Sequence, residues 1–311
     1  MRRSFILPSA AALALALAPA AGLAGPLHLF SGTSKAQGKS TAAADSAAVA
    51  VAAEVSQALD EKRYVDAGDL LNKAQIDGVK SVRLDRLRGE VLLATGHFAE
   101  AVAQLRPITT DPTEGAKALE CEGLALSIMG KSDQAFAALK SATSADKTLW
   151  RAWNGLGREY DLRHDWKESK AAYAEALAAP GANSAIVLNN RGYSYLLQNE
   201  PDQAIPDFVS ALAKDPALAA ARTNLRIAMA VQGHYDRAAV TGAGDDRAAV
   251  LNNVGLAAAV RGDYREAEKL LQEAIDAKGA NYERAFDNLE LAKNLEARAA
   301  EQSHSVSPAT P

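Results

Sequence analysis

The stretch AIVLNNRGYSYLLQNEPDQAIPDFVSALAKDP, residues 185–216, decides the fold of this chain. Its apolar residues recur every three or four positions on both sides of a polar turn, which predicts a hairpin of two amphipathic helices. Gly192 and Ala204 are small, and we expect the two helices to cross at close range there. Tyr195 and Phe208 are expected to fill the wedge toward the next hairpin. One hairpin cannot bury its apolar face alone, so the pattern has to repeat.

The pattern repeats along the chain in one register. The preceding unit contains Trp153, Leu156, Gly157 and Tyr160 at the spacing W-x2-L-G-x2-Y. Steps of about 34 residues give repeat starts near residues 48, 82, 116, 150, 185, 219 and 248, followed by a last helix at 282–300. The unit at 219 is short, with 248 − 219 = 29 residues, and its second half runs into the glycine-rich residues 241–244. Because glycine is a poor helix former, we expect its second helix to have one or two turns.

These spacings are the signature of the tetratricopeptide repeat (TPR), and residues 48–300 resemble TPR proteins. The resemblance implies an all-α fold, a TPR α-solenoid in which about seven helix-turn-helix hairpins and a C-terminal capping helix stack as a right-handed superhelix. No segment shows strand alternation between hairpin turns, so we expect no sheet.

The N-terminus has the features of an export signal. Arg2 and Arg3 form a basic start, residues 5–17 are apolar, and the small residues Gly22 and Ala24 suit a cleavage site. We therefore expect residues 1–24 to be a signal peptide and the mature chain to be exported to the periplasm.

The sequence argues against two other forms of membrane attachment, an uncleaved anchor and a lipid anchor. An uncleaved anchor is the alternative to cleavage, since residues 5–24 have the length of ~20 residues that a spanning helix needs. Pro8, Pro19 and the alanine-rich composition disfavour it. Pro26 stands where a lipoprotein would have its acylated cysteine, so lipid attachment by that route is excluded.

The segments on either side of the repeat array are polar, and the chain as a whole is mildly acidic. Residues 25–47 are rich in Gly, Ser, Thr, Ala and Lys and are predicted to be a flexible linker, and residues 301–311 a disordered tail. The formal net charge is −4, and removing residues 1–24 with their two arginines makes it −4 − 2 = −6. A mildly acidic chain with interspersed charges has no basic patch for nucleic acid.

No arrangement of residues indicates catalysis or a cofactor. His97, His164 and His234 fall in predicted turns of separate units, and Cys121 falls in the middle of a predicted helix. No spacing of Cys, His and carboxylates suits a metal ion, and no nucleophile motif or phosphate-binding glycine loop is present. We therefore expect a protein without enzymatic activity or cofactor.

In TPR proteins the first helix of each hairpin lines a concave groove, and this resemblance selects the candidate binding residues. In units two to four the groove positions are charged and net basic, with Arg83, Arg86, Lys117, Arg151 and Arg158 beside Glu90, Glu120 and Asp161. In units five to seven they are apolar or carry amides. The predicted peptide-binding groove consists of Arg151, Asn154, Arg158, Asn189, Asn190, Tyr193, Leu196, Leu197, Thr223, Asn224, Ile227, Asn252, Asn253 and Leu256.

Asparagine recurs at the sixth place of three units, as Asn190, Asn224 and Asn253. A row of amides has donors and acceptors that can bind the backbone of an extended peptide. The alternative interpretation is that these asparagines serve packing between helices, and the sequence does not decide between the two. Apolar anchors would come from the neighbouring Tyr193 and Leu196, with tyrosine a frequent hot spot.

The C-terminal half resembles one family of TPR proteins more closely. The runs that carry this resemblance are LNNRGY at 188–193, ARTNL at 221–225, LNNVG at 251–255, RGDY at 261–264 and A-x2-NL at 285–289. They are similar to the TadD family of tight-adherence (Flp) pilus assembly proteins, over residues 150–298. This resemblance implies a periplasm-facing scaffold or pilotin-like factor in pilus secretion.

Together these observations predict an exported, non-enzymatic scaffold that binds a peptide or helix of a partner protein, in pilus assembly or secretion. A general periplasmic TPR adaptor for outer-membrane assembly or for cell-wall enzymes is the alternative in the same class. A hydrolase built on a TPR array is disfavoured, because the sequence lacks a catalytic constellation.

Overall fold

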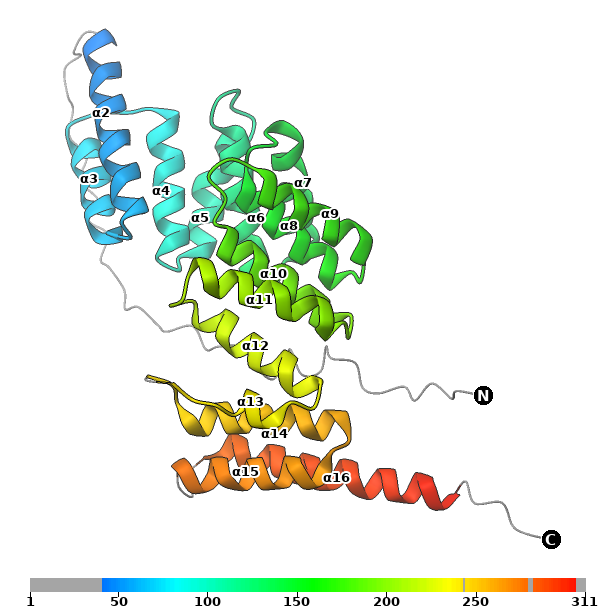
Figure 1. The fold of residues 1–311 in the computed structure, drawn as a ribbon. Coiled ribbons are helices and arrows are strands. Elements are labelled where there is room, and N and C mark those ends of the chain that lie inside the picture. The colour runs from blue at the N-terminus through cyan, green and yellow to red at the C-terminus, as the bar shows by residue number, and fades with distance from the viewer. Residues whose placement is uncertain (1–40, 243, 279–281, 306–311) are drawn as a thin grey trace. The chain divides into compact units, whose positions relative to one another are not determined.

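The computed structural model describes residues 41–242, 244–278 and 282–305, and every regular element in these ranges is helical (Figure 1). The predicted signal peptide lies outside the described residues. The described chain divides into two compact units, an N-terminal unit of residues 41–182 and a C-terminal unit of residues 183–305. Each unit is described by itself.

The N-terminal unit consists of four consecutive helical hairpins. Its helices are α2 (Thr41–Asp60), α3 (Tyr64–Ile76), α4 (Val82–Ala94), α5 (Phe98–Leu105), α6 (Gly115–Ile128), α7 (Ser132–Ala145), α8 (Trp150–Leu162) and α9 (Trp166–Ala178), with a 3-10 turn at Arg106–Ile108. We call α2, α4, α6 and α8 the first helices of their hairpins. Their apolar sides form the core together with the second helices.

The C-terminal unit continues the same pattern and ends on a single long helix. Its helices are α10 (Ser184–Leu197), α11 (Pro201–Lys214), α12 (Ala219–Val231), α13 (Tyr235–Ala238), α14 (Arg247–Arg261), α15 (Tyr264–Lys278) and α16 (Glu283–Ser305). Here α10, α12, α14 and α16 are the first helices. The predicted all-α fold of stacked hairpins is confirmed, and so is the short second helix of the sixth unit, because α13 has four residues.

Both ends of the array are more helical than the sequence analysis predicted. α2 begins at Thr41, within the stretch expected to be a flexible linker up to residue 47. The reason is alanine, which has the highest helix propensity and is abundant at the start of α2. α16 likewise continues to Ser305, past the predicted end at residue 300.

One contact recurs within the regular hairpins. A glycine of the first helix faces a large side chain of the second helix sixteen positions later, as Gly192 faces Phe208 (208 − 192 = 16). A Cβ atom at any of these glycines would lie within 3.0 Å of the opposing side chain, closer than real Cβ atoms are found. The pairs are Gly89–Leu105, Gly123–Leu139, Gly157–Tyr173, Gly192–Phe208 and Gly255–Leu271. Each large partner is buried, so the pair sets the close approach of the two helices.

This contact changes the expected role of Phe208. The sequence analysis placed Phe208 in the wedge between neighbouring hairpins and paired Gly192 with Ala204. In the structure the ring of Phe208 packs directly on Gly192 of its own hairpin, and Phe208 also belongs to the core cluster that contains Ile227 of α12. Glycine is needed at position 192 because the aromatic ring fills the space of a side chain there.

Candidate functional site

A pocket of about 370 Å³ opens on the first helices of the N-terminal unit. Its wall is made by Ser56, Leu59 and Asp60 of α2, Arg86, Leu87 and Glu90 of α4, Lys117 and Glu120 of α6, and Leu149 and Trp150 at the start of α8. Four consecutive hairpins therefore contribute to one pocket. A ligand that filled it would contact all four.

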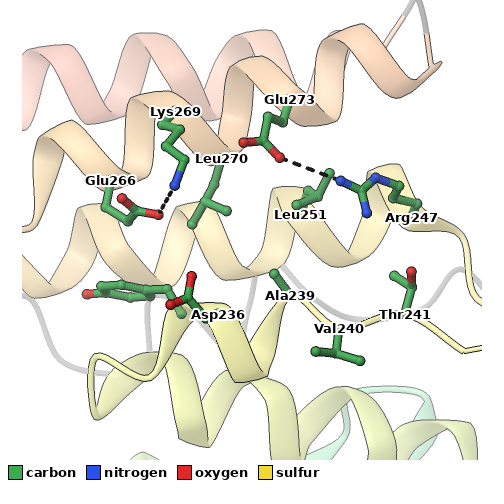
Figure 2. Close-up of a pocket in the computed structure, with 11 residues that line it drawn as sticks. Asp236, Ala239, Val240, Thr241, Arg247, Leu251, Glu266, Lys269, Leu270 and Glu273 are labelled. Carbon is green, nitrogen blue, oxygen red and sulfur yellow. Dashed lines mark hydrogen bonds and ion pairs between the residues drawn. The ribbon is translucent and has the colours of Figure 1, made fainter.

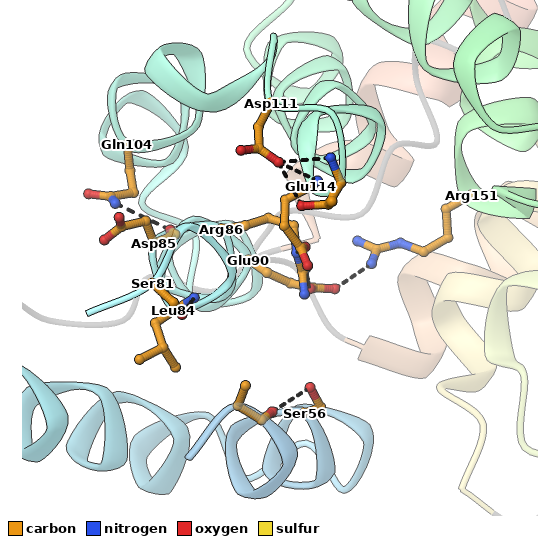
Figure 3. A network of polar contacts seen from close by, with 12 residues as sticks. Ser56, Ser81, Leu84, Asp85, Arg86, Glu90, Gln104, Asp111, Glu114 and Arg151 are labelled. Carbon is orange, nitrogen blue, oxygen red and sulfur yellow. Dashed lines mark hydrogen bonds and ion pairs between the residues drawn. The ribbon is translucent and has the colours of Figure 1, made fainter. Parts of the chain in front are cut away.

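Buried ion pairs fix the side chains around this pocket (Figure 3). The Arg86 guanidinium donates through Nε to Glu114 at 2.5 Å and through Nη1 to Glu90 at 2.6 Å. Arg151 of α8 donates to the other oxygen of Glu90 at 2.8 Å. The Arg86 side chain is only 7% exposed, so the centre of the network is shielded from water, whereas Arg151 at its end is 34% exposed. It connects α4 with α8 and with the residue that precedes α6.

The two carboxyl groups at the base of the pocket have opposite pKa shifts. Burial raises the pKa of Glu90, but the charges of Arg151 and Arg86 outweigh it, and the net pKa is lowered. For Glu120 burial is the largest cause, the charge of Glu90 adds to it, and the pKa is raised. Glu120 accepts a hydrogen bond from the backbone N–H of Ala152 at 2.9 Å. The pocket thus contains one firmly ionised carboxylate and one that is protonated more readily.

Of the predicted groove residues, three lie on α8. Asn154 is buried and Arg158 is exposed, and Arg151 is bound to Glu90 as described above. Arg86 and Arg151 are both paired with Glu90 of the same unit, so these two of the predicted basic groups already have a partner within the chain. Arg158 remains as a charge on the surface of α8.

In the C-terminal unit the predicted asparagines bind one another. Asn224 of α12 donates from Nδ2 to Oδ1 of Asn189 on α10 at 3.0 Å. Asn189 in turn donates to the neighbouring Asn190 at 3.3 Å. The side-chain amides of two consecutive first helices are thereby joined, and we call such a joint a rung.

A second rung has the same form. Asn288 of α16 donates to Oδ1 of Asn252 on α14 at 2.9 Å, and Asn252 donates to Asn253 at 3.2 Å. Asn252 is fully buried. Within the predicted row, Asn224 links two first helices, as the packing interpretation expects, whereas Asn253 accepts from Asn252 of its own helix. The two rungs form what we call the amide ladder.

The predicted apolar anchors divide into buried and accessible residues. Leu196, Ile227 and Leu256 are 6%, 5% and 3% exposed and belong to the core cluster of the unit. They were expected to line a groove, and the structure corrects this, because the neighbouring helices cover that side of their helix. Tyr193 and Leu197 are half-buried, as is Thr223. These three retain surface on the first helices.

The sixth hairpin departs from the regular contact. At the two places where regular hairpins have glycine and a large side chain, it has Arg226 and Gly242. The Arg226 guanidinium donates to the backbone carbonyl of Val240 at 3.0 Å and to Asp245 at 2.6 Å. Asp245 also accepts from the backbone N–H of Gly242 at 2.7 Å. The Arg226 side chain thus occupies the position of the glycine in regular hairpins, where the two helices approach closely, and it binds a loop instead of a second helix.

Figure 2 shows the pocket of about 350 Å³ that the short α13 leaves beside α14 and α15. Two ion pairs lie in its wall, Lys269 with Glu266 at 3.0 Å and Arg247 with Glu273 at 3.6 Å. Its apolar floor is already covered, since Leu251 and Leu270 are buried. The pocket accordingly offers little apolar area to a partner.

No chemical centre accompanies these surfaces in the part of the chain that the structure describes. No three His, Cys, Asp or Glu side chains are grouped there as a metal ion would need. Burial raises the pKa of the Cys121 thiol well above its ordinary value, so the thiolate that reacts is disfavoured. None of the described helices has the length and apolar composition to cross a bilayer.

The residues that the sequence analysis missed come from separate repeats. Trp150 and the α2 residues Ser56 and Asp60 were not among the predicted contacts, although Lys117 and Glu120 had been placed on the groove face. The repeat register identifies which side of a helix faces the groove. It contains no signal for which side chains of four helices meet in one pocket.

Comparison with known proteins identifies the fold. No protein-family model and no curated protein sequence matches the chain. A TPR protein from Parabacteroides merdae is 14% identical, with 80% of this chain and 100% of that chain covered and a TM-score of 0.52. PilF of Pseudomonas aeruginosa is 18% identical over 69% of this chain and 96% of its own, with a TM-score of 0.51. TTC0263, a TPR protein of Thermus thermophilus, is 17% identical over 58% and 98%, with a TM-score of 0.50. The chain therefore has the TPR solenoid fold.

Proposed function

We propose that this chain is an exported, non-enzymatic scaffold that binds an extended or helical segment of a partner protein on its first helices. The observation that carries the proposal is the pocket in the N-terminal unit, to which α2, α4, α6 and α8 all contribute. Two of its charged residues, Arg86 and Glu90, are held in place by ion pairs with each other and with Arg151, so a partner need not order them on binding.

The composition of the pocket suits a peptide. Trp150 is half-buried and offers an aromatic surface, and burying apolar area yields ~25 cal/mol per Å². Tryptophan is among the residues that most often dominate binding energy at interfaces. Lys117 and Asp60 at the exposed edge provide charges of both signs for the polar groups of a bound segment. Further contacts are proposed on α8 at Arg158 and, in the C-terminal unit, at Tyr193 and Leu197.

Site-specific crosslinking tests this surface. The photoreactive residue p-benzoylphenylalanine is introduced in place of Lys117, and for comparison in place of Lys140, which is exposed on the second helix α7. We expect irradiated cells to yield one defined crosslinked partner from position 117 and none from position 140. Trp150→Ala should reduce the yield at position 117. Equal crosslinking at both positions, or a yield unchanged by Trp150→Ala, would contradict the proposed surface.

We further propose that the partner belongs to a pilus assembly or secretion system. The runs similar to TadD proteins support this. Four of them lie on the first helices α10, α12, α14 and α16, and the run at 261–264 spans the turn from α14 to α15. Mass spectrometry of the crosslinked product identifies the partner. A pilus secretion component is the expected result, whereas a cell-wall enzyme or an outer-membrane assembly factor would favour the general periplasmic adaptor.

Export is the remaining part of the proposal, and it rests on the basic start and apolar stretch of residues 1–24. Cell fractionation and N-terminal sequencing should find a periplasmic chain that begins near Gly25. Palmitate labelling should be negative, because Pro26 occupies the place of the acylated cysteine. A full-length chain in the inner membrane would show that the segment is an uncleaved anchor.

A further inference from the structure

The amide ladder of the C-terminal unit has a gap between α12 and α14. In an intact rung, the asparagine at the fifth place of one repeat accepts from an asparagine of the next first helix: Asn189 accepts from Asn224, at the sixth place of its repeat, and Asn252 accepts from Asn288 of α16. α12 has Thr223 at the fifth place, and α14 has Asn253 at the sixth. No hydrogen bond joins these two residues, although both positions correspond to rung positions elsewhere in the unit.

A cavity of about 150 Å³ lies at this gap. Its lining residues are Thr223, Arg226, Gly244, Asp245, Asp246, Ala249, Val250 and Asn253. The Asn253 oxygen accepts from Asn252, but within the described chain Nδ2 of Asn253 and the hydroxyl of Thr223 have no hydrogen-bond partner. Both side chains are half-buried. The cavity is therefore lined by one free amide donor and one free hydroxyl.

The charged groups around the cavity are satisfied by other parts of the unit. Asp245 binds Arg226 at 2.6 Å and the N–H of Gly242. Asp246 caps α14 by accepting from the N–H of Ala249 at 3.2 Å, and it binds Lys278 at 2.7 Å. An ionic ligand would have to displace these pairs. A neutral group with both a donor and an acceptor would not.

We propose that this cavity, the ladder gap, binds a carboxamide side chain, Asn or Gln, of the partner segment. The partner amide takes the place of the missing rung, since Nδ2 of Asn253 donates to its oxygen and its NH2 group donates to the Thr223 hydroxyl. The volume is several times the ~30 Å³ that a water molecule takes in the liquid, which leaves room for such a group. This inference rests on the proposed function in that it assigns a sequence preference to the partner.

The test uses small probes with the full chain and needs no identified partner. N-acetyl-L-glutamine methylamide is titrated against the 15N-labelled protein, and N-acetyl-L-leucine methylamide, which has the same blocked main chain, is the matched control. We expect saturable shifts of the Asn253 side-chain NH2 signals and of the backbone amides of residues 244–246 with the glutamine probe. Binding of the leucine probe should be at least tenfold weaker. Equal shifts with both probes would mean main-chain recognition and would overturn the proposal, as would the absence of saturable shifts.

Two variants complete the test. Thr223→Asn supplies the missing rung, so it should raise the midpoint of thermal unfolding and abolish the glutamine-dependent shifts. Asn253→Ala removes the donor and should abolish them without raising the midpoint. Retained binding in either variant, with helical circular dichroism unchanged, would show that the ladder gap is not the site. A negative outcome leaves crosslinking at position 117 unaffected, so failure here is distinct from failure of the proposed scaffold function.

Discussion

The two units hold their first helices together by different chemistry. In the N-terminal unit α4 and α8 are joined by charges, through the bonds of Arg86 and Arg151 to Glu90. In the C-terminal unit α10 with α12, and α14 with α16, are joined by neutral amides. Five hairpins, three in the N-terminal unit and two in the C-terminal unit, are closed by the same glycine contact. The repeat thus fixes how a hairpin packs internally and leaves open how neighbouring first helices are linked.

The difference matters because buried charges and buried amides respond differently to change. An ion network is stable only while each charge has its partner, since an uncompensated buried charge is costly. An amide has no titratable group, and the loss of one amide leaves neutral donors and acceptors that water can reach. The N-terminal unit should accordingly be the more sensitive of the two to substitution and to pH.

The largest effect is expected for Arg86→Leu. The substitution leaves the carboxylates of Glu90 and Glu114 without their shared guanidinium, and we expect a loss of ~3–5 kcal/mol of unfolding free energy. Urea unfolding with hydrogen exchange of α4 and α6 measures it. Arg63→Leu is the control, because its pairs with Glu61 and Asp66 are about half exposed and solvent screens them, so the loss of unfolding free energy should be much smaller. Similar losses of unfolding free energy in both variants would show that the ion network around Arg86 contributes no more than an exposed ion pair.

A smaller effect is expected for Asn252→Ala in the amide ladder. Asn252 is fully buried and forms both hydrogen bonds of its rung, so the variant should lose ~1–3 kcal/mol. Hydrogen exchange should accelerate in α14 and α16. Asn294→Ala, at an exposed position of α16, is the matched control and should stay within ~0.5 kcal/mol of the parent. If Asn252→Ala lost as much unfolding free energy as Arg86→Leu, the amide ladder would be as sensitive to substitution as the ion network.

The hairpins and their irregularity could be predicted because they depend on local sequence. Gly157 and Tyr173, or Gly192 and Phe208, lie in one hairpin, and the repeat spacing identifies them without knowledge of the neighbours. The short α13 was predictable as well, since Gly242 falls where a helix would have to continue. These features are set by helix propensity and by contacts within about one repeat length.

The candidate sites could not be predicted to the same extent, because they depend on contacts between repeats. Arg151 and Glu90 are far apart in the sequence, and nothing in the composition indicates that they neutralise each other. Leu196 and Ile227 have the periodicity of a helix face, but periodicity does not tell how far the next helix covers that face. Thr223 stands where α10 and α14 have Asn189 and Asn252. That it interrupts a row of hydrogen bonds becomes visible only from the rungs on either side.

The smallest predicted effect is the change in stability on acidification. Its sign differs between the two carboxyl groups of the pocket, Glu90 and Glu120. The pKa of Glu90 is lowered in the folded chain, so its stabilisation is present at neutral pH and is lost as pH falls through that lowered pKa. The pKa of Glu120 is raised, so its ionised form costs stability at neutral pH, and this cost is relieved as pH falls through the raised pKa. On acidification the N-terminal unit should first become slightly more stable and then less stable.

Glu120→Gln isolates the first of these steps. Glutamine retains an oxygen that can accept from the N–H of Ala152 but does not ionise, so the variant should be more stable than the parent at neutral pH. Its unfolding midpoint in urea should then fall steadily from about pH 8 to about pH 4, without the initial rise. The amide ladder does not titrate, and hydrogen exchange of α14, corrected for its intrinsic pH dependence, should show no such maximum. A rise that persists in Glu120→Gln would assign the effect to another group and would remove Glu120 as the source of the pH difference between the units.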